Sequence, residues 1–196
     1  MTVGPITPMS VVLVALVGGP RLQARVDALA PQAAEILVLA PGGSEVSCAP
    51  ATRLIAVDAS VPDKRRIAFE EAKHPVVGFI EDTCSPPPDW CASMHAPFSE
   101  EKVALVCGPI VISPRLPSRH RALGITEYAR FHPDVMMKGE SDRGEARSLI
   151  GANFAVRKSA FSGNRADDFI DGALFARLTA AGEGVVVRSG GVFYDG

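Results

Sequence analysis

Short apolar runs rich in β-branched residues recur along this chain, and segments with helical spacing separate them. Runs of this length, closed by turn residues, are typical of buried strands. The clearest one, from Val76 to Ile80, ends at Glu81 and Asp82, and three prolines, Pro86–Pro88, then prevent the strand from continuing. Because strands and helices alternate, we predict an α/β sandwich with a mainly parallel central sheet.

The order of the segments predicts a single domain over residues 1–196. We expect strands over residues 10–17, 35–39, 53–57, 76–82, 103–112, 149–157 and 185–188. We expect helices over residues 21–30, 64–73, 88–98 and 168–181. From about residue 113 to 149 the periodicity fades, and only 124–131 hints at a helix or an extended edge. We interpret this segment as an irregular insertion, of the kind that often forms a lid or substrate loop.

The composition is that of a folded globular protein, with 47% hydrophobic and 21% charged residues. A formal net charge of -2 argues against a protein that binds nucleic acid through bulk electrostatics. One dense basic cluster occurs, consisting of Arg115, Arg119, His120 and Arg121. Proline and polar residues interrupt it, which favours a solvated loop over an anion-binding site.

The cysteines and the N-terminal apolar run bear on location. Cys48, Cys84, Cys91 and Cys107 show no CxxC spacing, so we expect reduced and partly buried thiols. The apolar run from Val11 to Val17 is too short for a membrane span, and no basic segment precedes it. We expect a cytoplasmic protein, with peripheral contact to a membrane surface left open.

Glu81 and Asp82 are the first candidate site, because ligands bind at the carboxyl edge of open α/β sheets. Adjacent carboxylates there suit a hard cation or sugar hydroxyls. Successive side chains along a strand point to opposite faces, so we expect only one of these two acids to reach a shared cleft. The alternative is that both acids merely cap a turn.

Asp171 and the segment 151–153 are the other two candidates. The spacing of Ile170, Leu174 and Leu178 predicts a buried helical stripe with Asp171 on its flank near the helix start. An acid there either stabilises the helix N-terminus or serves as a general base. Gly151 allows close approach of a ligand to the backbone, and Asn153 offers both a donor and an acceptor.

The remaining residues that often carry chemistry show no ligand pattern. We expect core packing or surface placement for the single tryptophan, Trp90, and for the four histidines, which lack a metal-ligand spacing such as HxxxH: His74, His95, His120 and His132.

Taken in order, these segments resemble family 2 glycosyltransferases. The resemblance rests on Phe79–Thr83 followed by Pro86–Trp90, on Gly151–Arg157, and on Ile170–Leu178, and it extends over almost the whole chain. It implies the nucleotide-diphosphosugar transferase fold called GT-A. Members of the family typically use a UDP- or GDP-sugar, hold its diphosphate through a divalent cation, and invert the anomeric centre in a single displacement.

The resemblance also implies roles for individual residues. Glu81, Asp82 and Thr83 fall on the family's Asp-x-Asp motif for metal and sugar nucleotide, and Asp171 falls on its catalytic base. Gly151 and Asn153 fall on the segment that lines the donor and acceptor cleft. Lys64 and Arg65 fall where the family often has basic or amide side chains near the nucleotide.

The chain departs from the family pattern at three places. Thr83 stands where the last acid of the motif usually supplies a metal ligand. Residues 39–44 lack the acid that contacts the nucleotide base in the family. Phe193, Tyr194 and Asp195 stand near the position of a family histidine, which makes Asp82 and Asp195 the candidate ligands of a Mg²⁺ or Mn²⁺ ion.

The expected function is transfer of a sugar from a nucleotide-diphosphosugar to an unknown acceptor hydroxyl, with Asp171 as general base. The departures leave an alternative open: a degenerate protein of this fold that binds a sugar nucleotide or a protein partner without catalysis. A further alternative is a nucleotidyltransferase on a related sheet, which would respond to a nucleoside triphosphate.

Overall fold

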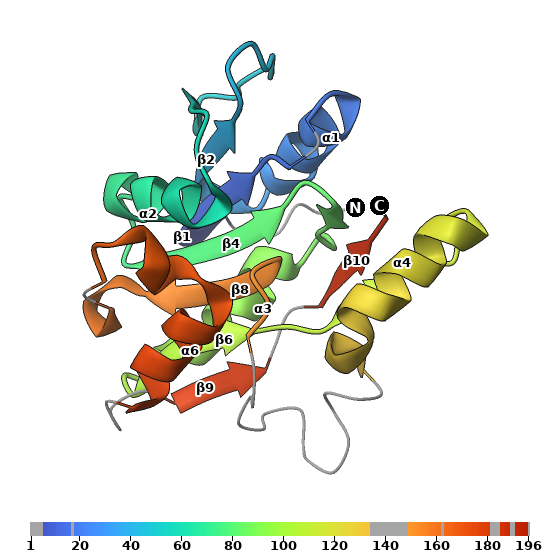
Figure 1. Cartoon of the computed structure of the whole chain (residues 1–196). Coiled ribbons are helices and arrows are strands. Elements are labelled where there is room, and N and C mark those ends of the chain that lie inside the picture. The colour runs from blue at the N-terminus through green and yellow to red at the C-terminus, as the bar shows by residue number, and fades with distance from the viewer. Residues whose placement is uncertain are drawn as a thin grey trace.

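The computed structural model describes residues 6–16, 18–133, 149–161, 163–180, 185–188 and 191–195. Its centre is a seven-stranded sheet in the order β3-β2-β1-β4-β8-β6-β9 (Figure 1). The strands are β1 Thr7–Val14, β2 Ala33–Ala40, β3 Thr52–Ala56, β4 Val76–Glu81, β6 Val103–Cys107, β8 Asn153–Arg157 and β9 Val185–Arg188. Only β8 runs antiparallel to its neighbours β4 and β6, so the expected mainly parallel α/β sheet is confirmed.

Helices cover both faces of this sheet. Two buried clusters of apolar side chains show the layers, because one contains residues of α1 and α3 and the other contains residues of α2 and α6. The helices are α1 Pro20–Leu29, α2 Val61–Glu71, α3 Trp90–His95, α4 Ser118–Tyr128 and α6 Asp171–Ala180, with short 3-10 turns η1 Ala96–Ser99, η2 Ala129–Phe131, η3 Lys158–Ala160 and η4 Ala166–Phe169. Among the described residues, no helix is both long enough and apolar enough to cross a membrane.

A second sheet of three strands lies beside the first, in the order β5-β10-β7. Its strands are β5 Cys84–Ser85, β7 Ile110–Ile112 and β10 Val192–Tyr194. The single strand expected over 103–112 is therefore wrong, since β6 and β7 belong to different sheets. Pro109 lies at the break and has no N–H for a ladder, while its carbonyl accepts from Val192 N at 3.1 Å and from Asn153 Nδ2 at 3.2 Å.

The segment expected to be irregular contains a helix, α4, which lies outside the main layers (Figure 1). Tertiary packing explains this helix. The rings of Tyr128 and Tyr194 lie 4.9 Å apart, and a Cβ at Gly124 would come within 2.8 Å of the Tyr194 ring, so only glycine allows this approach. Residues 134–148 of the expected insertion lie outside the described residues, as does the expected helix end at Gly182.

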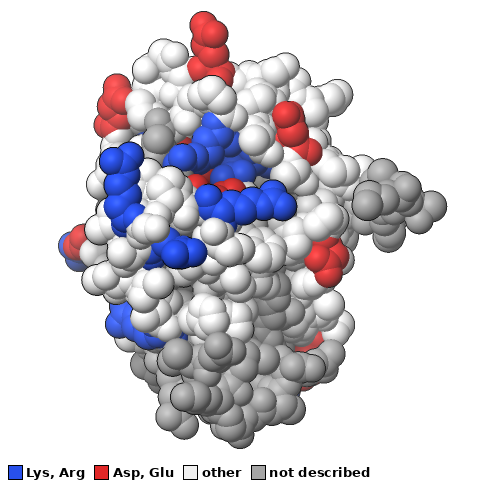
Figure 2. All heavy atoms as spheres, turned by 90° about the vertical axis from the view of Figure 1, so that its right-hand side faces the viewer, with Lys and Arg blue, Asp and Glu red and all other residues white. Residues whose placement is uncertain are grey.

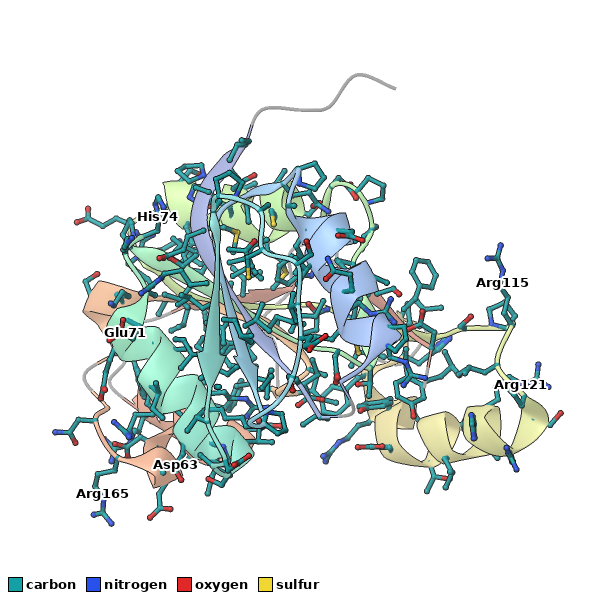
Figure 3. The ribbon with its side chains drawn as sticks, turned by 90° about the horizontal axis from the view of Figure 1, so that it is seen from above. Asp63, Glu71, His74, Arg115, Arg121 and Arg165 are labelled. Carbon is teal, nitrogen blue, oxygen red and sulfur yellow. The ribbon has the colours of Figure 1, made fainter. Side chains whose placement is uncertain are left out.

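Figure 3 shows several charged side chains at the periphery, among them Asp63, Glu71 and Arg165. Arg115 and Arg121 extend away from the core beside and on α4, which agrees with a solvated basic cluster, although part of it is helical. Three cysteines are buried, Cys48 is exposed, and all four are free thiols, as expected. The expected buried stripe at Asp171 is partly wrong: Leu174 and Leu178 are buried, but Ile170 precedes α6 and is 48% exposed.

Gly78 provides a test of core packing. It lies in the middle of β4, where an added Cβ would come within 2.6 Å of Met9 Cε and 3.1 Å of the Trp90 ring. We expect Gly78→Ala to lower the free energy of unfolding by about 1–3 kcal/mol through overpacking. Chemical denaturation measures this change.

The matched control is Gly172→Ala in α6, because a Cβ there meets no atom within 4 Å. This substitution should leave the free energy of unfolding unchanged or raise it by up to about 1 kcal/mol, since alanine favours the helix. Equal effects of the two substitutions would contradict the packing described around Gly78.

Candidate functional site

Two hollows lie at the carboxyl edge of the main sheet, where β1, β2 and β4 end. One is a cavity of about 190 Å³ between the end of β4, the start of β8 and α4, and the other is an open groove of about 570 Å³ between the loops that follow β1 and β2. In open α/β sheets this edge is where ligands bind. Most of the residues singled out from the sequence lie at or near one of these two hollows.

Glu81 and Asp82 point to different places, as the alternation along a strand predicts. Glu81 lines the cavity. Asp82 is fully buried, and its carboxylate accepts from Leu16 N at 2.9 Å and from Gly18 N at 2.7 Å. Asp82 therefore fixes the loop after β1 to the end of β4, and its side chain does not line the cavity.

Arg65 joins two acids that are 90 residues apart in the chain. From α2, its Nη2 donates to Glu81 Oε1 at 3.1 Å and its Nη1 donates to Asp171 Oδ1 at 2.7 Å. Nη1 also donates to the carbonyl of Phe169 at 3.1 Å. Because the Arg65 side chain is only 5% exposed, this buried guanidinium connects α2, β4 and the start of α6.

Asp171 is the first residue of α6, and its carboxylate is 38% exposed. Its second oxygen, Oδ2, accepts from the backbone N–H of Gly151 at 2.8 Å. A Cβ at Gly151 would collide with the Arg65 guanidinium, so only glycine leaves room for this arrangement. Within the described residues, the partners of the Asp171 carboxylate are Arg65 and Gly151, which makes a simple helix-capping role the poorer interpretation.

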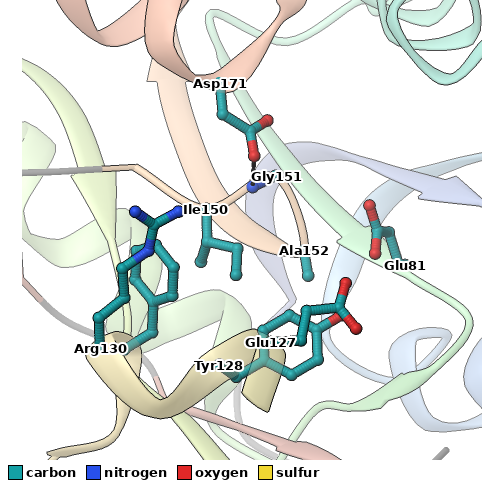
Figure 4. Close-up of a pocket in the computed structure, with 9 residues that line it drawn as sticks. Glu81, Glu127, Tyr128, Arg130, Ile150, Gly151, Ala152 and Asp171 are labelled. Atoms are coloured by element: carbon teal, nitrogen blue, oxygen red, sulfur yellow. Dashed lines mark hydrogen bonds between the residues drawn. The ribbon is translucent and has the colours of Figure 1, made fainter. Parts of the chain in front are cut away.

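The cavity is closed by residues that the sequence did not single out. Figure 4 shows Asp171 on one side of it, Glu81 on another, and Glu127, Tyr128 and Arg130 opposite Asp171. These last three come from α4 and η2, and Phe131, Ile150 and Ala152 complete the lining. The sequence signals for this wall were the insertion over residues 113–149, of the kind that often forms a lid or substrate loop, and the weak helical hint over residues 124–131.

Burial raises the pKa of two groups in the cavity. The pKa of Glu81 is raised from its ordinary value mainly because burial penalises the carboxylate, and Asp171 adds to this while Arg65 opposes it. Burial also raises the pKa of Tyr128, with Glu81 as the next cause, so its phenol stays protonated and can donate a hydrogen bond. The cavity thus combines a buried acid with a raised pKa, Glu81, and a more exposed acid, Asp171.

Two of the expected site residues lie in the core. Asn153 is fully buried, its Oδ1 accepts from Trp90 Nε1 at 2.9 Å, and its Nδ2 donates to Pro109. The indole of Trp90 is also buried, so its expected packing role is confirmed. Lys64 is 6% exposed, and its Nζ donates to the carbonyl of Ala15. The side chains of Asn153 and Lys64 therefore stabilise the structure around the cavity, whereas Gly151 lies in the lining of the cavity.

The groove is built largely of glycine. Its lining is Gly18, Gly19, Pro41, Gly42, Gly43, Ser44 and Glu45. Gly18, Gly19 and Gly43 have φ angles of 75°, 67° and 80°, a backbone conformation that favours glycine. With few side chains in the lining, backbone N–H and C=O groups are open to a flat or polar ligand. From the residues themselves the sequence indicated turns here, and the family resemblance placed a nucleotide-base contact, without its usual acid, at residues 39–44.

The expected metal ligands are not arranged to hold a cation. Asp195 is paired with a guanidinium, because its Oδ1 accepts from Arg25 Nη2 at 2.7 Å and its Oδ2 accepts from Ser85 Oγ at 2.6 Å. The Thr83 side chain is buried, and the Asp82 carboxylate lies under the β1 loop. Among the described residues, no three His, Cys, Asp or Glu side chains are grouped to bind a metal. The expected site at Asp82 and Asp195 therefore does not fit a divalent ion.

The buried acid Glu81 gives a prediction on pH. Its raised pKa means that the folded protein keeps a proton which the unfolded chain releases above about pH 4.5, so this group lowers stability as the pH rises from there through the folded pKa. Glu81→Gln removes that dependence. As the pH rises across this window, the free energy of unfolding of the variant should increase relative to that of the wild type. The increase should be on the order of 1 kcal/mol for each unit by which the folded pKa of Glu81 exceeds its unfolded pKa.

Urea denaturation at a series of pH values measures this gain. Glu70→Gln is the matched control, because Glu70 pairs with Arg66 on the exposed face of α2. Parallel stability profiles for Glu81→Gln and wild type would contradict the raised pKa.

Comparison with known proteins identifies the fold. No protein-family model matches the chain, and no curated protein is similar to it in sequence. Solved structures do match. Glucosyl-3-phosphoglycerate synthase from Mycobacterium tuberculosis, in complex with phosphoglyceric acid, matches with a TM-score of 0.58 and 14% identity over 97% of this chain and 71% of the other.

Two further structures show the same likeness. A crystal structure described as a mycobacterial protein matches with a TM-score of 0.60 and 14% identity over 97% of this chain and 68% of the other. GalNAc-T7 with UDP, GalNAc and Mn²⁺ matches with a TM-score of 0.61 and 11% identity over 96% of this chain and 44% of the other. The chain has a GT-A-like α/β fold with a mainly parallel central sheet, as the resemblance in sequence implied.

Proposed function

We propose that this protein is a glycosyltransferase that moves a sugar from a nucleotide-diphosphosugar to an acceptor hydroxyl. One observation carries the proposal: on a GT-A-like fold, Asp171 and Glu81 share a cavity at the sheet edge that also bears an open glycine-lined groove. Such a fold alone does not determine activity, so the proposal rests on the side chains.

The groove is suited to the nucleoside part of a donor. The loops after β1 and β2 line it, and its glycines let a base and ribose approach the backbone closely. Asp82 holds one wall in place through Leu16 and Gly18. Because β4 lies next to β1, a donor seated here would extend its diphosphate and sugar toward the end of β4 and the cavity.

Asp171 has the geometry of a general base. An ionised carboxylate offers about four lone-pair sites, and Arg65 and Gly151 use two of those on Asp171. With the carboxylate more than a third exposed, a remaining site can accept the proton of an acceptor hydroxyl. The acceptor oxygen then forms a bond to the anomeric carbon, and the bond from that carbon to the diphosphate breaks with its electron pair leaving on the diphosphate.

Arg65 positions this base, because it fixes one carboxylate oxygen of Asp171 while the N–H of Gly151 fixes the other. The acceptor side of the cavity carries three acids, Glu81, Glu127 and Asp171, against Arg130 in the lining. Because Arg65 also pairs with Glu81 and Asp171, the charges around the cavity nearly balance, and its lining offers hydrogen-bonding groups that suit a compound with free hydroxyl groups.

Asp171→Asn tests the proposed base. We expect release of UDP or GDP from sugar nucleotides, assayed with a panel of hydroxyl acceptors, to slow by roughly 10²- to 10⁴-fold, because asparagine cannot take up the proton. Donor binding, followed by thermal shift, should stay near that of the wild type.

Asp167→Asn is the matched control. Asp167 lies four residues away on η4, and it is 74% exposed in a surface pair with Arg165. It should turn over like the wild type. Undiminished turnover by Asp171→Asn would remove Asp171 from the base role, and the absence of a thermal shift with any UDP- or GDP-sugar would contradict the proposed donor.

A further inference from the structure

We infer that the guanidinium of Arg25 takes the place of a divalent cation, so that this protein binds the diphosphate of a nucleotide without a metal. The inference rests on the proposed function, since it concerns how the same donor is held. The starting observation is that Asp82, Thr83 and Asp195 are not arranged to coordinate a metal ion.

The Asp195 carboxylate is already paired with a positively charged side chain, that of Arg25. Its Oδ1 lies 2.7 Å from Arg25 Nη2, and its Oδ2 accepts from Ser85. The backbone N–H of Asp195 donates to the carbonyl of Thr83 at 3.1 Å, which places the carboxylate beside the end of β4. A divalent ion at Asp195 would have to share this carboxylate with the guanidinium, whose positive charge opposes its binding.

Arg25 is held rigidly at this position. Its side chain is only 9% exposed, and its Nε donates to the carbonyl of Asp82 at 3.1 Å. Within the described part of the chain, the hydrogen bonds of Arg25 engage Nε and Nη2, which leaves further N–H groups of the planar guanidinium for an anion. A guanidinium binds phosphate oxygens in pairs, and a buried one is already ordered before the ligand arrives.

The surroundings of Arg25 are suited to a diphosphate. Arg21 lies one turn earlier on α1. Burial and Glu127 raise the pKa of the Tyr194 phenol, and the positive charge of Arg21 opposes this increase. Arg25 thus faces Asp195 where α1 meets β10, and Arg21 adds a second positive charge near Tyr194. Figure 2 shows Lys and Arg side chains gathered on the side of the molecule where α4 and β10 lie, with acidic atoms between them.

This position also adjoins the proposed nucleoside groove. Gly18 and Gly19 line the groove and directly precede α1, which carries both arginines. Gly18 is bonded to the carboxylate of Asp82, and Arg25 is bonded to the carbonyl of the same residue. A nucleotide in the groove would therefore bring its diphosphate to Arg25 without crossing another element.

Calorimetric titration with UDP and with GDP tests the inference, each in EDTA and in excess Mn²⁺. We expect one of these nucleotides to bind in EDTA with a Kd within about threefold of its Kd in Mn²⁺, which corresponds to less than about 1 kcal/mol. Binding that Mn²⁺ tightens tenfold or more would overturn the inference and leave the proposed function standing. A lack of binding in both buffers would overturn both.

Asp195→Asn separates the two ways of holding the diphosphate. If Arg25 binds it, this variant should bind the nucleotide in EDTA as tightly as the wild type or more tightly, because the guanidinium has lost a competing anion. If Asp195 is a metal ligand, the variant should lose the affinity that Mn²⁺ provides, and this outcome would contradict the inference.

Arg25→Lys keeps the charge but loses the planar fork, so it should weaken nucleotide binding in EDTA by about tenfold or more. Its melting temperature shows whether the fold is kept. Arg66→Gln is the control, because Arg66 pairs with Glu70 on the outer face of α2, and it should bind like the wild type. Unchanged binding by a folded Arg25→Lys would argue against Arg25 as the diphosphate ligand.

Discussion

The ion pairs of Arg65 organise this site. A guanidinium that is almost inaccessible to water joins Glu81 at the end of β4 to Asp171 at the start of α6, and its third contact is the carbonyl of Phe169. Removing one partner of such a buried pair leaves an uncompensated charge and costs about 3–5 kcal/mol. Arg65 therefore helps to hold α6 over the sheet and to orient Asp171. It also sets the charge beside the cavity.

A second arginine has the corresponding role on the other side of β4. Arg25 joins α1 to the carbonyl of Asp82 at the end of β4 and to the carboxylate of Asp195, which follows β10. The two arginines differ in how far their positive charge is neutralised. Arg65 is shared between two carboxylates and has no positive charge to spare, while Arg25 faces a single carboxylate and lies one turn from Arg21.

Some site residues could be predicted from the sequence because they depend on local rules. Glu81 follows an apolar run that prolines terminate, so its place at a strand end follows from chain chemistry alone. The same holds for the alternation that sends Glu81 into the cavity and Asp82 under the β1 loop. Asn153 shows the limit of local reasoning: a polar residue at a strand start suits a ligand equally well, and only the buried indole of Trp90 opposite makes it a core residue.

The wall made by α4 depends on contacts that no local pattern contains. Its residues have weak amphipathic character, and the helix is held by Gly124 and Tyr128 against Tyr194, a residue 66 positions beyond Tyr128. The division of residues 103–112 between two sheets likewise follows from β10 pairing with β7 at one side and β5 at the other. The sequence by itself determined the α/β alternation and the strand-end acids, because hydrophobic periodicity and proline act within a few residues. Only the tertiary structure decided which charges meet, because the pairs of Arg65 with Asp171 and of Arg25 with Asp195 join residues more than 100 positions apart.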